Sequence, residues 1–498
     1  MTIEDTLKRM AASNINQVRL AWCDVHGELR SKTLMPLAVE DALHHGIGMV
    51  GTLALKDSSD RTAFKVFEAD SMHALPELGA LAHAANLTLR PVLESYQELP
   101  WAPGTAWMQG QLHHADGRPL AVDTRQMLKT ALDQLEAQGL GLRCGLEVEF
   151  HIYKIESTRP QLDPELADWP GLPPAVSVVH PGYKLLSEQY TDLCEAPLRI
   201  VRETAQALGL PLTSLEIEFG PSQVEAVFAP TDALIAADNM VLFRSATRQA
   251  LRRAGYHATF MCQPPFPHVM GSGWHLHQSL VSLEDSNNAL ALPLPPEALQ
   301  DWYKRAMAPV QAMLPLPKPL QAASYLSPTG CHYLAGLLAH ARGATALSNP
   351  SINAYARFAA NALAPQSVVW GHDNRGAMLR VIAPSEQPGA TRIENRVGEP
   401  LANPYLYLAS QIYAGLDGIA RQLAPPAATE SPYQAGAAKL PMSLDEALQA
   451  LQSDAVLCAA LGPNFVDYFC TIKRQETARY AAAQDKTDWQ RREIFARF

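Results

Sequence analysis

Cysteines are few in this 498-residue sequence, and their arrangement excludes two kinds of site. There are 7, an odd number, scattered along the chain and never arranged as CxxC. A disulfide framework and a thiolate zinc site are therefore both unexpected. Such cysteine usage is typical of a protein in the reducing cytoplasm, which is where we expect this one.

Long apolar runs and an excess of positive charge are also missing. No stretch reaches the roughly eighteen apolar residues of a membrane-spanning helix, and the charged N-terminus has no apolar signal core. The 40 basic and 50 acidic residues give a net charge of −10, which argues against nucleic acid or an anionic membrane as a partner. Small molecules are the expected ligands.

Two common nucleotide-binding signatures are absent as well. The sequence has no GxxxxGK[ST] phosphate-binding loop and no HRD or DFG motif. These absences exclude a P-loop nucleotidase and a protein kinase, so any nucleotide site belongs to another fold.

The pattern of strands and helices divides the chain at residues 115/116. Residues 16–34 alternate apolar and polar residues around the turn Asp24–Gly27, which predicts a hairpin in a small β-rich unit, residues 1–115. Turn-forming residues around Pro119 separate it from residues 116–498. There, helices near 124–138, 197–208 and 231–254 alternate with strands at 142–153, 214–219 and 223–228, and a further pair of strands at 257–261 and 273–280. Helices beside an antiparallel sheet predict an α+β fold.

The stretch GSGWHLHQSL, residues 271–280, places three polar side chains at a spacing of two. Successive side chains of a strand alternate between its faces, so His275, His277 and Ser279 are expected on one face. Trp274 and Leu276 are expected on the core side. A histidine on a strand is more often structural than functional, so the side chains that meet these two decide their role.

Other strands offer carboxylates at the same spacing. Glu147 and Glu149 in LEVEF share one face, and Glu216 and Glu218 in LEIEF share another. Glu225 is expected across the turn from Glu218. For a single pair, a solvated strand edge is the ordinary explanation. Several pairs together with a histidine favour a site for a hard divalent cation, Mg²⁺ or Mn²⁺.

The region 349–396 adds positive charge. For any one arginine, a surface charge network is the simplest explanation. Beside a metal site, guanidinium groups bind phosphoryl oxygens and carboxylates bidentately, which favours phosphoryl transfer from a nucleotide. A guanidino phosphotransferase is one alternative enzyme of this kind. The residues concerned are Arg357, Arg375, Arg380, Arg392 and Arg396, with Glu394 between the last two.

Several motifs together resemble those of the glutamine synthetase family and occur in its order: LEVEF, EFGPSQVE, GSGWHLHQSL, NPSINAYARF, NRGAMLR and RIENRVGEPLANPYL. The resemblance covers nearly the whole chain. It implies a small N-terminal β-grasp domain and a large catalytic domain with an antiparallel sheet and flanking helices. It also implies a homododecamer of two stacked hexameric rings, with active sites between neighbouring subunits.

The resemblance further implies ATP, two or three Mg²⁺ or Mn²⁺ ions per active site, and roles for individual residues. One metal would be held by Glu149, Glu218 and Glu225, and a second by Glu147, His275 and Glu394. ATP would contact His277, Ser279, Arg375, Arg380 and Arg392. Glutamate would contact Glu149, Gly271, His275, Arg357 and Arg396, and the implied catalytic residues are Glu149, Arg375 and Arg396. The implied reaction joins the γ-carboxylate of glutamate to an amine through γ-glutamyl phosphate, releasing ADP and phosphate.

Two departures from the family pattern concern the amine. Leu363 stands where ammonia-using members have a glutamate, and Met270 where they have an asparagine. An alkyl amine with a pKa of about 10.4 must lose a proton at pH 7, at a cost of roughly 4 to 5 kcal/mol, whereas an arylamine is already neutral. Both apolar residues would suit a ring or an alkyl chain. We therefore expect a γ-glutamyl amine ligase, similar to the γ-glutamylanilide synthetases, that prefers an aromatic or hydrophobic amine to ammonia.

Other functions stay open. A γ-glutamylpolyamine synthetase or an ammonia-using glutamine synthetase would perform the same chemistry on another amine. A catalytically inactive structural or regulatory relative predicts the loss of metal or phosphate groups, whereas all six matching ligands and the arginines are present. The C-terminal segment 486–498 is expected to form a helix that packs on its own subunit or on a neighbour.

Overall fold

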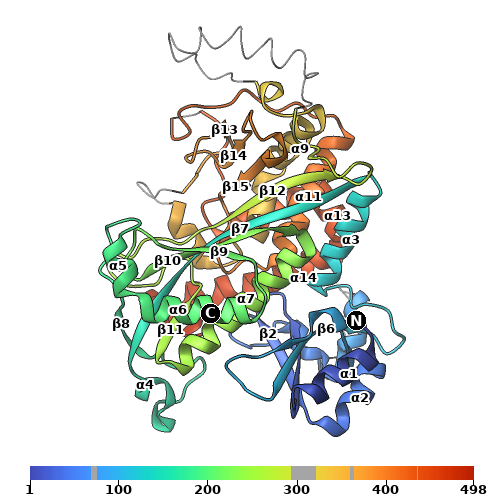
Figure 1. Ribbon diagram of the computed structural model, residues 1–498, viewed down its shortest axis with the longest axis vertical. Coiled ribbons are helices and arrows are strands. Elements are labelled where there is room, and N and C mark those ends of the chain that lie inside the picture. Colours follow the sequence, from blue (N-terminus) through green and yellow to red (C-terminus); the bar gives the residue numbers. More distant parts are fainter. Residues whose placement is uncertain (69–75, 293–320, 359–363, 435) are drawn as a thin grey trace.

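The computed structural model describes residues 1–68, 76–292, 321–358, 364–434 and 436–498, which form two sheets with their helices. The smaller sheet belongs to the N-terminal part, blue in Figure 1, and the larger sheet crosses the middle of the molecule. The predicted α+β fold, with a small N-terminal β-grasp domain and a larger domain built on an antiparallel sheet, is confirmed.

The N-terminal sheet contains β1 (Gln17–Cys23), β2 (Leu29–Leu34), β3 (Ile47–Val50), β4 (Asn86–Pro91), β5 (Gln97–Glu98) and β6 (Thr105–His113), accompanied by the helices α1 (Ile3–Ala12) and α2 (Pro36–His45). The strand order is β2-β1-β6-β4-β3, and β1 is antiparallel to β2 but parallel to β6. The predicted hairpin is confirmed, and Gly27 supplies the positive φ of +80° that its turn requires. The domain division at 115/116 stays a prediction.

The described part of the large sheet has nine strands, with the order β13-β14-β15-β12-β7-β10-β9 and with β8 and β11 also paired to β7. They are β7 (Leu140–Ser157), β8 (Ala175–Val178), β9 (Leu212–Ile217), β10 (Gln223–Asp232), β11 (Tyr256–Thr259), β12 (Trp274–Ser282), β13 (Trp370–His372), β14 (Leu379–Ile382) and β15 (Arg392–Asn395). The pairs are antiparallel except for β13 with β14.

The further pair of strands predicted at 257–261 and 273–280 is present as β11 and β12. Both pair with β7, at residues 151–154 and 140–148 respectively. The 18 residues of β7 accommodate both partners one after the other.

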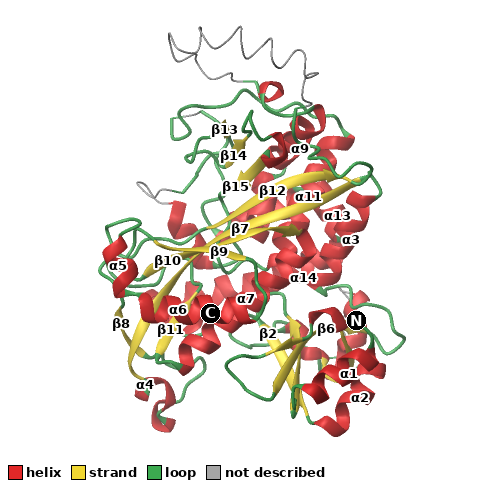
Figure 2. Cartoon of the chain, in the orientation of Figure 1, coloured by secondary structure: helices red, strands yellow, loops and turns green. Residues whose placement is uncertain are grey.

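Alternation along β7 separates an apolar face from a polar face. Leu146, Val148 and Phe150 are buried, and the Phe150 ring meets Phe243 of α7 (Ala233–Arg253) with centroids 5.9 Å apart. Figure 2 shows α7, α3 (Thr124–Glu136) and α11 (Pro404–Ala420) on this side of the long strands. Burial of the apolar face against helices leaves the face that carries the glutamates open for a site.

The predicted helices are confirmed as α3, α6 (Glu195–Ala207) and α7, although α7 begins after the N-cap Asp232 instead of Thr231. The other α-helices in the described residues are α4 (Arg159–Leu162), α5 (Glu188–Leu193), α9 (Pro328–Ala339), α10 (Ala341–Ser348), α12 (Leu444–Ser453), α13 (Ala455–Leu461), α14 (Pro463–Ala482) and α15 (Lys486–Gln490). Within the described ranges, no single helix has the length and apolarity to cross a membrane; α13 and α14, bent by 101° to each other, pass that test only as a pair.

The C-terminal segment packs on its own chain. After α15 it continues as a π-helical turn, Arg491–Phe495. The buried Thr259 hydroxyl donates to the Phe498 carbonyl (2.6 Å), and His257 Nε2 donates to the Phe495 carbonyl (2.8 Å). Of the two expected roles for this segment, the structure shows the intramolecular one.

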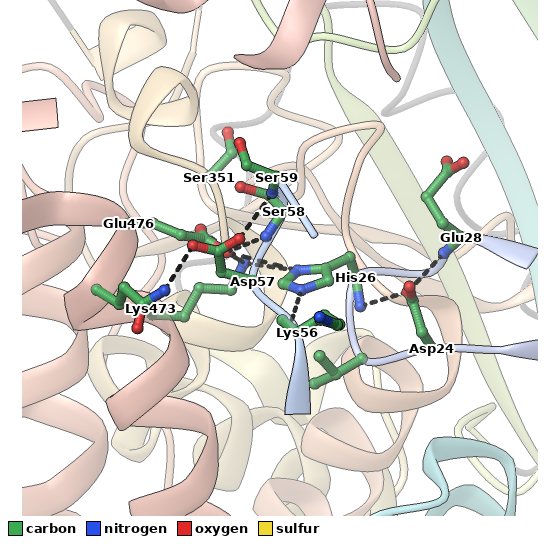
Figure 3. A network of polar contacts seen from close by, with 12 residues as sticks. Asp24, His26, Glu28, Lys56, Asp57, Ser58, Ser59, Ser351, Lys473 and Glu476 are labelled. Carbon is green, nitrogen blue, oxygen red and sulfur yellow. Dashed lines mark hydrogen bonds and ion pairs between the residues drawn. The ribbon is translucent and has the colours of Figure 1, made fainter. Parts of the chain in front are cut away.

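A buried polar network joins the N-terminal domain to α14 (Figure 3). Lys473 Nζ lies 3.1 Å from a carboxylate oxygen of Glu476 and 3.2 Å from Nδ1 of His26. The other oxygen of Glu476 accepts a hydrogen bond from the Ser58 backbone (3.0 Å). The loop after residue 55 is thus held by its own chain, through a helix more than 400 residues further along the sequence.

Candidate active site

Strand register brings acidic side chains into one row. Glu225 on β10 lies opposite Glu149 on β7 and, on its other side, opposite Glu216 on β9. His275 on β12 lies opposite Glu147 on β7. Three carboxylates therefore follow one another across three strands, and His275 lies beside Glu147. Alternation predicted which side chains share a face, and the strand register adds this row.

The predicted position of Glu225 needs one correction. It was expected to lie across the turn from Glu218, but β9 ends at Ile217 and the register places Glu225 opposite Glu216. Glu218 follows the strand, and its backbone N–H bonds to the Gln223 carbonyl at 3.0 Å. Both Glu216 and Glu218 still line the same cavity, so the predicted shared side is confirmed.

The polar face of the large sheet borders a cavity of about 1160 Å³. The predicted site residues that line it are Glu147, Glu149, Glu218, Glu225, Met270, Gly271, His275, Arg357, Arg375 and Arg396. Next to this lining, on β12, β14 and β15, lie His277, Ser279, Arg380, Arg392 and Glu394. Leu363 lies outside the described residues.

Glu147 is the centre of the cluster. One of its carboxylate oxygens is 3.2 Å from His275 Nδ1, and the other is 2.9 Å from His277 Nε2. Burial alone would raise the pKa of Glu147, but the contacts with the two imidazoles outweigh it and hold the pKa well below its usual value. The pKa of the fully buried Glu394 is also lowered, because His275 and Arg396 together overcome the effect of burial. Both groups are therefore ionised in the site.

Glu218 and Glu225 behave in the opposite way. Burial, followed by the charge of Glu149, raises the pKa of Glu218 to about 7. Burial, again followed by Glu149, raises the pKa of Glu225 to about 10. Crowded carboxylates on one sheet face repel each other unless a cation compensates them, so this arrangement fits a site for divalent metal.

Two groups of side chains bring potential ligand atoms within 4.8 Å of one another. One is Glu147, Glu225 and His275, and the other is Glu147, His277 and Glu394. Glu147 belongs to both, so the cluster is continuous. Oxygen donors with one or two imidazole nitrogens suit Mg²⁺ or Mn²⁺ better than a soft metal.

The hydrogen bonds of His277 distinguish it from His275. Arg392 Nε donates to His277 Nδ1 at 3.2 Å, and an arginine cannot accept. His277 Nδ1 must therefore be unprotonated, which leaves the proton on Nε2, facing Glu147. In this tautomer Nε2 carries the proton toward Glu147, and it would have to lose that proton to bind a metal. Ser279 donates its hydroxyl to the Thr391 carbonyl at 2.8 Å.

Glycines allow Arg357 to pack close to the cavity wall. A Cβ on Gly271 would lie 2.5 Å from Arg357 Cγ, and a Cβ on Gly273 would lie 2.6 Å from its Nη2. Arg357 is 6% exposed and donates to the carbonyls of Val397 (3.1 Å) and Gly398 (2.8 Å). The guanidinium is thus fixed at the cavity with one nitrogen bound to backbone.

Glu394 accepts hydrogen bonds from two more of the predicted arginines. Arg396 Nη1 donates to one of its oxygens, and Arg380 Nη1 donates to the other at 3.0 Å. Arg380 also bonds Asp373 at 2.6 Å. Arg375 is exposed and faces the cavity. The structure therefore brings the carboxylates and the arginines to one place.

Some lining residues were not found from the sequence. Gln223 donates to Glu149 (3.1 Å) and to the Ser272 hydroxyl (3.0 Å), and its position two residues before Glu225 placed it on the same face. Gln263 and the segment 430–434 also line the cavity. Neither has a pattern in the sequence that would reveal it, because both lie in irregular segments.

A family model of the glutamine synthetase catalytic domain matches residues 121–318 and 316–492. The chain belongs to the glutamine synthetase family. A gamma-glutamylanilide synthase from an Acinetobacter species is 34% identical over 506 residues, covering 99% of this chain and 95% of that protein. A gamma-glutamylethanolamide synthetase from Streptomyces coelicolor is 28% identical, covering 99% and 96% of the two chains.

Among solved structures, a GmaS/ADP complex matches with a TM-score of 0.74 and 26% identity, covering 98% of each chain. Apo GmaS matches with the same TM-score, 25% identity and coverage of 97% and 98%. The predicted membership of the glutamine synthetase family is confirmed, and this member of it is an ATP-dependent carbon–nitrogen ligase.

Proposed function

We propose that the protein joins the γ-carboxylate of L-glutamate to a primary amine that carries an aromatic or hydrophobic group. The γ-carboxylate oxygen attacks the terminal phosphorus of ATP and ADP leaves. The amine nitrogen then attacks the acyl carbon of γ-glutamyl phosphate, and phosphate leaves. The observation that carries the proposal is the place of Met270, an apolar side chain in the wall of the cavity that holds the carboxylates and Arg357. The 34% identity to a gamma-glutamylanilide synthase supports it.

A cationic alkyl amine is the second candidate acceptor. Glu216 lines the cavity and is not among the metal ligands that the family pattern implies. Its carboxylate, which accepts from Ser214 at 2.7 Å, offers a negative charge to an ammonium group. The relative named for ethanolamide synthesis is in line with this candidate.

The carboxylate cluster fits two or three Mg²⁺ or Mn²⁺ ions per site. Glu149, Glu218 and Glu225 would hold one, and Glu147, His275 and Glu394 a second; the donor tautomer of His277 supports leaving it out of both sets. When bound, such ions would neutralise charge on the phosphate oxygens. His277, Ser279, Arg375, Arg380 and Arg392 would then face ATP, while Arg357 would hold the α-carboxylate of glutamate and Arg396 would lie by the γ-carboxylate.

The proposed assembly is a homododecamer of two stacked hexameric rings. Large apolar side chains are exposed at or beside the cavity, among them Leu185 (53%), Leu186 (61%) and Phe219 (37%). Such a patch is typical of a surface that a partner covers. A neighbouring copy over this patch would complete the active site.

The acceptor is tested by glutamate-dependent ATP hydrolysis with ammonia, putrescine, isopropylamine and aniline. We expect the highest kcat/KM with aniline, because its amine is neutral at pH 7 and its ring gains free energy by burial against Met270. The product is identified by mass spectrometry as the γ-glutamyl anilide. A highest value with ammonia would refute the proposed acceptor, and one with putrescine or isopropylamine would favour the second candidate.

The role of Met270 is tested by Met270→Asn. A polar amide in the wall is expected to change the ratio of kcat/KM for aniline to kcat/KM for ammonia by about tenfold in favour of ammonia, since an apolar contact of this size is worth 1 to 3 kcal/mol. Met35→Asn, at a side chain that is 53% exposed, is the matched control. An unchanged ratio would remove Met270 from the acceptor site.

A further inference from the structure

The loop that carries Met270, residues 262–272, is held by a hydrogen bond between its two ends and by a second bond from a side chain that lines the cavity. The Ser272 N–H donates to the Cys262 carbonyl at 2.6 Å, so the two ends of the segment 262–272 are held together. Within the loop, Gln263 Nε2 donates to the Val269 carbonyl at 3.3 Å. Gln263 therefore holds the backbone immediately before Met270.

The backbone of Gln263 is held by two hydrogen bonds with the side chain of a buried asparagine. Its N–H donates to Asn353 Oδ1 at 2.6 Å, and its carbonyl accepts from Asn353 Nδ2 at 2.9 Å. Asn353 is 3% exposed and also donates to Gln490 Oε1 at 3.0 Å. It belongs to the 3₁₀ helix Ile352–Phe358, which also carries Arg357. The Met270 loop is thus locked to the helix that bears the proposed glutamate-binding arginine.

Gln263 also lines a second cavity. This cavity has a volume of about 870 Å³, and its lining shares Gln263 and Ala356 with the lining of the first. The rings of Phe266, Tyr355 and Tyr480 are among its walls. A residue shared by two linings lies where the cavities adjoin, so the length of its side chain would set how far a ligand in the first can extend toward the second.

We propose that Gln263 is a specificity-determining residue for the amine: its amide fixes the Met270 loop, and its side chain closes the acceptor end of the active cavity against the aromatic second cavity. The inference rests on the proposed function and adds a limit on the length of the acceptor. Amines whose apolar group extends past the Gln263 side chain are excluded. Asn353 is a positioning residue that acts through the Gln263 backbone.

Two substitutions separate the two roles. Gln263→Ala shortens the side chain, and we expect the ratio of kcat/KM for 4-butylaniline to kcat/KM for aniline to rise by about tenfold or more, the size of effect that methylene-scale changes in a pocket produce. Gln263→Met keeps the length but removes the donor to Val269. We expect it to lower kcat/KM for aniline by about fivefold, the worth of one hydrogen bond, with the butylaniline ratio unchanged. The ratio of the two kcat/KM values, measured on one preparation, does not depend on the fraction of enzyme that is active. Partial misfolding of a variant therefore cannot change this ratio.

Thr487→Ala, at a residue of the second cavity that does not line the first, is the matched control and is expected to leave the ratio as it is. The KM for glutamate should stay within about twofold in every variant, because the backbone bonds of Arg357 are untouched. If the ratio of kcat/KM for 4-butylaniline to kcat/KM for aniline is the same in Gln263→Ala and in the parent protein, Gln263 does not limit the length of the acceptor. If the parent uses ammonia best, the proposed acceptor fails instead, and the ratio of butylamine to ammonia in the same variants still tests Gln263.

Discussion

Replacing Glu147 with glutamine is expected to lower kcat for glutamate-dependent ATP hydrolysis by about 100- to 1000-fold, the loss that follows removal of one preorganised electrostatic group. Glu147 contacts both His275 and His277 and belongs to both groups of potential metal ligands. The amide keeps the shape of the side chain but removes the charge that its lowered pKa maintains. The measurement is kcat against Mg²⁺ concentration up to saturation, which separates weaker metal binding from a slower reaction.

Glu156→Gln provides the control on the same strand. Glu156 lies near the end of β7, is 49% exposed in its side chain, and accepts from Ser177 at 2.6 Å, away from the cavity. Its substitution is expected to leave kcat within about twofold, as for a surface charge. A Glu147→Gln enzyme that keeps more than about a tenth of the parent kcat at saturating Mg²⁺ would show that Glu147 is not a central ligand.

The faces of the site strands could be predicted because they depend only on local geometry. The period of two in LEVEF and WHLHQS places Glu147, Glu149, His275 and His277 opposite buried apolar residues, and the structure has them so. The apolar alternates Trp274 and Leu276 are fully buried, as predicted. The same argument gave the hairpin around Asp24–Gly27, whereas the helices near 124–138, 197–208 and 231–254 followed from local helix start and stop signals.

Register and long-range contacts could not be predicted, because they depend on how distant segments pack. A shift of two residues along β9 exchanges Glu216 for Glu218 opposite Glu225 without moving any side chain to the other face, so alternation cannot distinguish the two. The Gln263–Asn353 pair spans 90 residues, between an irregular segment and the 3₁₀ helix Ile352–Phe358. In both cases the sequence shows which types of side chain are available to the site, whereas tertiary packing determines which of them are in contact.

The network in Figure 3 is another such packing contact, and it leads to the largest expected loss of stability. Lys473→Met is expected to destabilise the protein by about 3 to 5 kcal/mol, because Glu476 would remain buried without its cation. The side chains of Lys473, Glu476 and His26 are each 4% exposed, so water cannot solvate the Glu476 carboxylate once the lysine is removed. His26 Nδ1 would also lose its donor. The measurement is the urea midpoint at a fixed protein concentration.

A double variant shows whether the lost pair is the cause. Adding Glu476→Gln to Lys473→Met removes the uncompensated charge and should restore about 1 to 3 kcal/mol, while the single Glu476→Gln destabilises. Lys8→Met is the matched control: Lys8 and Glu4 are 70% and 77% exposed, and an ion pair in water contributes at most about 1 kcal/mol. Additive effects of the two substitutions would mean that Lys473 and Glu476 do not stabilise the protein as a pair. A non-additive result would show that the two buried charges act together.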